Sequence, residues 1–247
     1  ECKSDRLTVS MDAKTDLSVN QQELELLEQP LGEDFLDLAV ARYGYSGGLE
    51  SFFNEVGYVT TDVGTTVASL PDGGYSILDP TVANSEVTGL FMKHMVVANE
   101  FIYSAGVAFL DNNLLDQILF LTRYTLDGFV DSSFGDAGWV FFEWPKPKDT
   151  AFVDLLVFDD GDIVAVGDGD TEGEQYTTGH IVLKGFKSDG SPDLNFGSGG
   201  LVETFGEDAG LLQIRQTQGA TTLEDKILVV STAWFSNKAL RPMVTRY

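Results

Sequence analysis

The sequence predicts an all-β fold, a β-propeller-like array of about three to four antiparallel sheets with four strands each. Three observations indicate this fold. A cassette of about sixty residues recurs along the chain, Asp-Gly pairs punctuate the cassettes, and short apolar stretches with strand periodicity fill the intervals. With 247 residues, of which 43% are hydrophobic, the chain has enough apolar material to bury a core.

The repeat is found in three stretches that align without gaps, at residues 42–59, 123–140 and 185–202, which we call the first, second and third cassettes. An aromatic residue marks each copy, and the marker recurs at the last residue of the sequence. The markers are Tyr43, Tyr124, Phe186 and Tyr247, separated by 81, 62 and 61 residues. The period is therefore near 61, with about 20 extra residues in the first interval.

The repeated positions have simple physical explanations. Asp127-Gly128 and Asp189-Gly190 predict tight turns, and Ser46-Gly47 is their equivalent in the first cassette. Gly135 and Gly197 correspond to Asn54, the side chain that best tolerates a left-handed backbone, so we expect a positive φ there. One position holds an aromatic in all three cassettes and is expected to pack within the fold; its residues are Phe53, Phe134 and Phe196.

Each full period contains about four predicted strands. The second period gives 138–144, 151–158, 162–167 and 181–186, and the third gives 201–205, 211–217, 226–231 and 243–247. In Trp139 to Trp144 both alternating faces are mostly apolar, which is typical of a strand covered on both sides by stacked sheets.

The run from Arg123 to Gly138 reads Arg-Tyr-x-x-Asp-Gly-x-x-Asp-x-x-Phe-Gly-x-x-Gly, and residues 160–167 follow it as Asp-Gly-Asp-Ile-Val-Ala-Val-Gly. This combination resembles the delta-60 repeat, a propeller-type module of bacterial extracellular and surface proteins. The resemblance covers residues 35–247. The first cassette departs from it at Ser46, Glu50 and Asn54, and the third has Gly185-Phe186 in place of Arg-Tyr.

These patterns divide the chain into an N-terminal segment, residues 1–34, and a repeat domain, residues 35–247, with units at about 44–124, 125–186 and 187–247. The N-terminal segment is either a tether or a source of first-sheet strands, at 7–11 and 23–28; residues 21–28 equally suit a short helix. Four sheets would close a small propeller, whereas three would leave exposed edges that require a partner.

The formal net charge of −24 argues against nucleic acid as a partner, because no cluster of Lys and Arg reverses the charge locally. No apolar run approaches the roughly 20 residues that span a bilayer, so no transmembrane segment is expected. A single cysteine permits neither an internal disulfide nor a cysteine-rich metal site.

Cys2, followed by a polar stretch, resembles the start of a mature bacterial lipoprotein, in which the leading cysteine is acylated. Glu1 departs from that pattern, since a small residue normally precedes the acylated cysteine; the alternative for Cys2 is an exposed free thiol. The repeat resemblance and the acidic surface favour an extracellular or bacterial cell-surface location.

Functional residues are expected where the units differ. The loop after residue 167 presents Asp168, Asp170 and Glu172 with Gly173 at the sixth position, a pattern that suits a calcium loop. The twelfth position is Gly179 and the flanks are strands, which excludes an EF-hand. An acidic, solvated loop is the alternative, and no other metal or cofactor motif is found.

Three residues are candidates for partner binding. His94 lies in the insertion at residues 64–97, Trp144 begins a stiff Trp-Pro-Lys-Pro-Lys loop, and Tyr176 lies in the acidic loop. The Gly-x-Ser-x-Gly pattern around Ser46 is interpreted as accidental, because no helix follows it.

These observations favour a non-enzymatic, secreted or surface module that binds a protein or glycan through its loops. A second hypothesis is a structural subunit that self-assembles through sheet edges or through the 64–97 insertion. The third, an acid-based hydrolase or lyase, lacks any carboxylate pair that the sequence distinguishes.

Overall fold

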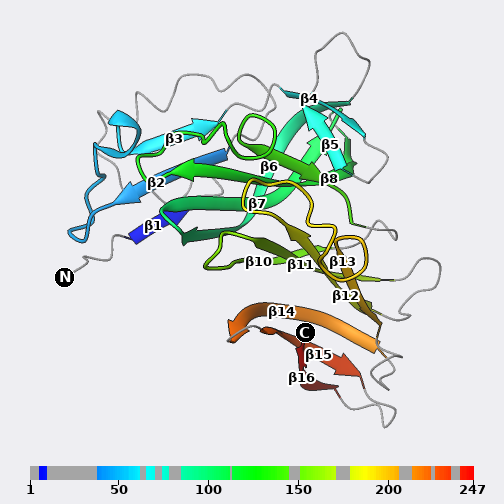
Figure 1. Cartoon of the computed structure of the whole chain (residues 1–247). Coiled ribbons are helices and arrows are strands. Elements are labelled where there is room, and N and C mark those ends of the chain that lie inside the picture. The colour runs from blue at the N-terminus through cyan, green and yellow to red at the C-terminus, as the bar shows by residue number, and fades with distance from the viewer. Residues whose placement is uncertain are drawn as a thin grey trace.

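Four antiparallel sheets follow one another along the chain in the computed structural model, and the last two are joined at one edge into a continuous seven-stranded sheet (Figure 1). The structure describes residues 6–9, 38–61, 65–69, 74–77, 85–111, 113–144, 151–170, 179–205, 213–223, 226–234 and 240–247. Apart from the short 3-10 helix η1, Phe53–Glu55, every element in these residues is a strand. The predicted all-β, propeller-like array is therefore confirmed, although its sheets in the described residues do not all have the expected four strands.

The first sheet has the order β1-β2-β3, formed by Arg6–Val9, Leu38–Tyr43 and Tyr58–Thr61. Strand β1 pairs with β2 so that Arg6 lies opposite Tyr43. The N-terminal segment thus contributes a strand to the first sheet. Residues 23–28 lie outside the described residues.

The second sheet contains the longest strands, β6 (Ser85–Ala98), β7 (Phe101–Leu110) and β8 (Asn113–Thr125), followed by β9 (Trp139–Phe142). Strands β4 (Thr65–Ser69) and β5 (Gly74–Ile77) pair with β6 and β9 and close this sheet into a six-stranded barrel. The insertion 64–97 therefore lengthens one unit and joins the two edges of its sheet.

The third sheet comprises β10 (Ala151–Val157), β11 (Ile163–Asp170), β12 (Gly179–Phe186) and β13 (Leu201–Phe205). The fourth comprises β14 (Gln213–Leu223), β15 (Lys226–Trp234) and β16 (Leu240–Arg246). One residue pair, Gly179 with Ile214, connects the third sheet to the fourth.

Sheet boundaries differ from the unit boundaries expected at the aromatic markers. Strands β3, β9 and β13 follow the markers Tyr43, Tyr124 and Phe186, yet each turns back to pair with β2, β8 and β12, the strands that carry those markers. The first strand of each unit thus completes the sheet of the preceding unit. Sequence periodicity could not show this, because it does not report which strands pair.

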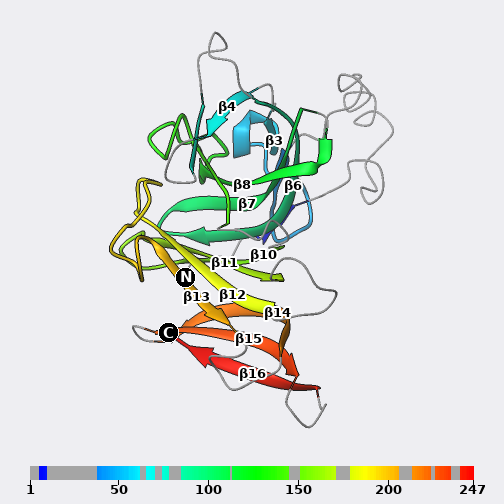
Figure 2. The same cartoon turned by 90° about the vertical axis from the view of Figure 1, so that its right-hand side faces the viewer.

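The sheets stack face to face, with a separate hydrophobic core in each interval (Figure 2). Strand β9 lies between two of these cores. Its Trp139 and Phe141 face the first core, whereas Phe142 and the following Trp144 face the second. The predicted two-sided covering of this segment is confirmed.

The array is an open stack in the described part of the chain. The first sheet packs on the second, the second on the third and the third on the fourth, whereas the first and fourth sheets lie at opposite ends and do not pack against each other (Figure 1). Each end sheet therefore has one face that no other sheet of the described chain covers.

Candidate functional site

The cassette turns join neighbouring units through a set of contacts that occurs twice. The Asn54 N–H donates to the carbonyl of Asp127 at 2.6 Å, and the Gly135 N–H donates to the carbonyl of Asp189 at 2.7 Å. Asn54 and Gly135 have φ values of 47° and 54°, which confirms the expected left-handed backbone. The positive φ aims each amide at the following turn.

An aromatic ring covers the glycine of each following turn. A Cβ on Gly128 would lie 2.9 Å from the Phe53 ring, and a Cβ on Gly190 would lie 3.1 Å from the Phe134 ring. Both glycines have φ near 88°, so the turn needs glycine for its backbone and for the space above it. The recurrent aromatic is therefore scaffold, as expected from its recurrence.

Arg123 connects the second and third cassettes. Its Nε donates to Asp131 at 2.8 Å, its Nη1 donates to the carbonyl of Ser188 at 2.6 Å, and its guanidinium lies 4.3 Å from the centre of the Phe101 ring. Burial of Asp131 opposes its ionisation, but hydrogen bonds from Ser133 and the charge of Arg123 outweigh it and hold the pKa of Asp131 below its usual value. This ion pair is structural.

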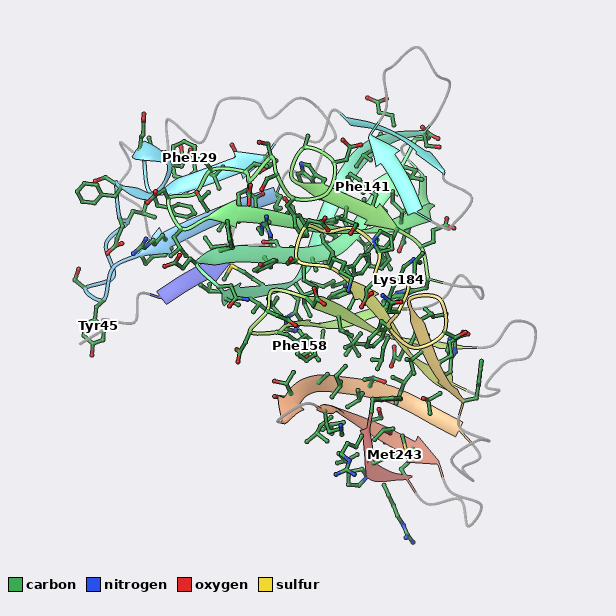
Figure 3. The ribbon with its side chains drawn as sticks, in the orientation of Figure 1. Tyr45, Phe129, Phe141, Phe158, Lys184 and Met243 are labelled. Atoms are coloured by element: carbon green, nitrogen blue, oxygen red, sulfur yellow. The ribbon has the colours of Figure 1, made fainter. Side chains whose placement is uncertain are left out.

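Exposed apolar side chains lie on the turns of the first two cassettes. We call this set the rim patch: Tyr45, Phe52 and Val56 of the first cassette, with Leu126 and Phe129 of the second. Tyr45 is 95% exposed and Phe52 is 89% exposed. Figure 3 shows Phe129 near β3 and Tyr45 apart from it, on the loop beyond β2, both at the end of the molecule that carries the first sheet. Several large aromatics exposed on neighbouring loops are candidates for an interaction surface.

The charged residues on the loops that carry the rim patch are all acidic, and one cation, Arg42, lies beside them and pairs with Glu50. Residues 44–57 and 125–138 contain Glu50, Glu55, Asp127, Asp131 and Asp136, and no Lys or Arg. The two loops are tied together by the Asn54 to Asp127 bond and by Arg42, whose Nη1 donates to the carbonyl of Leu126 at 3.3 Å. The apolar side chains are therefore presented on a joined, anionic support.

The sequence did not single out the rim patch, because an aromatic is by default assigned to a core. A signal was nevertheless present. Phe52 stands where the other cassettes have Ser133 and Asn195, and Phe129 stands where they have Gly48 and Ser191. An aromatic at a position that is elsewhere small or polar indicates an outward side chain.

His94 lies on β6 and contacts the third sheet. Its Nε2 lies 3.2 Å from Oδ1 of Asp154, whose Oδ2 accepts a 2.6 Å hydrogen bond from the Ala220 N–H. Asp154 is 9% exposed and thus links strands β6, β10 and β14. His94 takes part in packing between sheets, and it does not adjoin the rim patch by any contact in the described residues.

Trp144 also packs inside the fold. It is 9% exposed and meets Phe142 edge to face at 5.5 Å in the core between the second and third sheets. The ring is therefore not presented at the surface as a docking residue would be. His180 lies within β12 and is fully buried against Phe205.

The calcium loop remains a prediction. Asp168 lies at intermediate exposure and its Oδ2 accepts a 2.6 Å hydrogen bond from the Thr217 N–H, while Asp170 ends β11. Glu172, Tyr176 and Cys2 lie outside the described residues. Within the described ranges, no three His, Cys, Asp or Glu side chains gather at metal-binding distance.

The part of the chain that the structure describes has no helix with the length and hydropathy needed to cross a membrane. The sequence matches no family model, and a search of curated proteins returns no match. Among solved structures, the chain is similar to an exo-1,5-alpha-L-arabinanase from a bovine ruminal metagenomic library, at 7% identity over 85% of each chain and with a TM-score of 0.25. At this TM-score the likeness carries no argument about the activity of this chain.

Proposed function

We propose that this protein is a non-enzymatic, secreted or cell-surface binding module, and that the rim patch binds a protein or glycan partner. The observation that supports the proposal is the exposure of Tyr45, Phe52 and Phe129 on joined turns at one side of a rigid sheet stack. Rings held in this way offer a large contact area with few rotatable bonds, and aromatic residues are enriched at the centres of interfaces.

The surrounding contacts support a pre-organised surface. The amide of Asn54 and the ring of Phe53 fix the first turn against the second, and Phe53 is 1% exposed. A partner would therefore meet loops that are already ordered, which reduces the entropy lost on binding.

A panel of soluble polysaccharides and a displayed peptide library provide the two ligand classes for the test. The expected result is saturable binding that weakens about tenfold or more in the variants Phe52→Ser and Phe129→Ser, because each removes an anchor ring. Leu194→Ser is the matched control, since Leu194 is 66% exposed on the third cassette, outside the rim patch.

The hydrolase or lyase alternative has a separate readout. Cleavage of a polysaccharide that disappears when one named carboxylate is changed to its amide, at unchanged stability, would establish catalysis and overturn the proposal. Ligand binding that is unchanged in both Phe52→Ser and Phe129→Ser would also contradict the proposed binding role of the rim patch.

A further inference from the structure

The outer face of the fourth sheet is apolar and cationic. Strand β15 turns Ile227 and Val229 into the core, so Leu228, Val230 and Thr232 point to the opposite side. Their register partners on β16 are Arg246, Val244 and Pro242, which share that outer face. Val244 and Leu240 are 63% and 58% exposed, so neither is covered within the chain. We call this surface the terminal face.

The charge of the terminal face opposes that of the whole protein. The chain has 39 Asp and Glu against 15 Lys and Arg, yet strands β15 and β16 contain three cations and no acid. Lys226 and Arg246 share the outer face by strand alternation and register, whereas Arg241 lies opposite the buried Ala233 and is not part of it. Arg246 is exposed and lies opposite Leu228 on the outer face. An aliphatic centre with cations around it suits a protein surface that is apolar and acidic.

The rim patch has this complementary chemistry. It offers Tyr45, Phe52 and Val56 beside Glu55, on two loops whose own charged residues are all acidic. The neighbouring Arg42 is paired with Glu50. It lies with the first sheet, at the far end of the stack from β15 and β16 (Figure 3, where Met243 marks the fourth sheet). One chain therefore cannot join its own two surfaces.

We infer that the terminal face of one copy docks on the rim patch of a second copy, head to tail. The inference rests on the proposed binding role of the rim patch and names a partner for it. The two surfaces differ, so the contact is heterologous, and repeated contacts produce a chain of copies or a ring rather than a symmetric dimer. The aliphatic residues of one copy would meet the aromatic rings of the other inside a border of opposite charges.

The experiment measures mass by sedimentation and light scattering over a wide range of protein concentration. The unmodified protein is expected to associate, and Val244→Glu and Arg246→Glu are each expected to weaken association by about tenfold or more, because each places a like charge against the acidic rim. Added salt is expected to weaken the association of the unmodified protein. Leu194→Glu is the matched control and should associate normally.

Mixing two blocked variants gives the sharpest readout. Val244→Glu keeps its rim patch and Phe52→Ser keeps its terminal face. At a concentration where each variant alone is monomeric, an equimolar mixture should therefore give a dimer that cannot grow. A monomeric unmodified protein at every concentration would overturn the inference. So would association that survives Val244→Glu and Arg246→Glu.

Failure of the self-association and failure of the proposed binding function can be distinguished. If the unmodified protein is monomeric but binds a polysaccharide or peptide through Phe52 and Phe129, the self-association is wrong and the binding role stands. If the rim substitutions change neither ligand binding nor mass, both are wrong.

Discussion

The hydroxyl of Tyr247 donates a 2.8 Å hydrogen bond to Oγ1 of Thr204, which joins the last aromatic marker to the third sheet. The same relation occurs two junctions earlier, where the hydroxyls of Tyr124 and Thr61 lie 2.7 Å apart. At the middle junction the marker is Phe186, and the matching residue is Phe142, with ring centres 5.0 Å apart. At each of these junctions the two matching residues are either both polar or both apolar. No hydroxyl at these junctions therefore packs against a phenylalanine ring in place of a hydrogen-bond acceptor.

This matching predicts the outcome of a double-mutant cycle. Tyr124→Phe should lower the free energy of unfolding by about 1 kcal/mol, because the hydroxyl of Thr61 loses its buried partner. Adding Thr61→Val should recover most of that loss, since the junction then resembles the apolar pair of Phe186 and Phe142. Chemical denaturation of the four proteins measures the coupling, and strictly additive losses would contradict the prediction.

The buried phenol of Tyr124 is also expected to make the protein less stable at alkaline pH. Burial raises its pKa from 10.0 to about 12. Because the folded protein holds the phenol neutral more strongly than the unfolded chain does, this stabilisation is complete below pH 10 and is lost as the pH rises toward 12. Denaturation midpoints measured across this interval should fall more steeply for the unmodified protein than for Tyr124→Phe.

Two glycines with the same backbone separate local strain from contact between units. Gly128 and Gly47 have φ values of 88° and 87°, but a Cβ on Gly128 would meet the Phe53 ring, whereas nothing lies within 4 Å of one on Gly47. Both alanine variants should lose about 1–3 kcal/mol from backbone strain. Gly128→Ala should lose about 1–3 kcal/mol more from the clash. Equal losses in thermal and chemical denaturation would show that the ring moves freely.

Asp154 is expected to hold the third and fourth sheets together. Its carboxylate accepts the backbone N–H groups of Ala220 and Leu155, and β14 is irregular between Thr217 and Gly219, next to this contact. Asp154→Ala should cost about 1–3 kcal/mol because it leaves these amides without an acceptor. Asp159→Ala, on an exposed turn, serves as the control and should stay within about 0.5 kcal/mol. Faster amide exchange in β14 would locate the effect.

The calcium loop predicts a response to chelation. Ion binding to the folded state alone stabilises it, so a chelator should lower the melting temperature of the unmodified protein. Asp170→Asn should abolish that response, and this variant is preferable because Asp168 also supports the Thr217 amide. If neither the chelator nor added calcium changes the melting temperature, the predicted calcium site is wrong.

Local features of the fold were predictable from the sequence. Strands, turns and the positive φ of Asn54 depend on a few neighbouring residues, and the structure has β10 at Ala151–Val157 where 151–158 was expected. Pairing of β9 with β8 and closure of the barrel by β4 and β5 depend on contacts distant in sequence, which periodicity does not encode.

The candidate site was less predictable. His94 was chosen because it lies in the inserted segment and Trp144 because it begins a stiff loop, but neither signal reports the direction of a side chain. Trp144 is buried, and His94 lies 3.2 Å from Asp154 of the third sheet. Phe52 and Phe129 were passed over because hydrophobicity alone favours burial. The positive charge of the terminal face depends on which residues of β15 and β16 lie side by side, and the sequence alone does not give this pairing.

The pairing of β9 with β8 and of β13 with β12 has a consequence for synthesis on the ribosome. A nascent sheet gains its last strand only after the cassette loop that follows its aromatic marker has left the ribosome. The sheet is therefore completed later than the marker is synthesised, by the time needed to synthesise that loop. We expect the sheets to fold in order from the N-terminus, and each sheet to be completed only when the first strand of the following unit has been synthesised. Stalled chains that end at Tyr124 should accordingly be more sensitive to protease than chains that extend past Phe142.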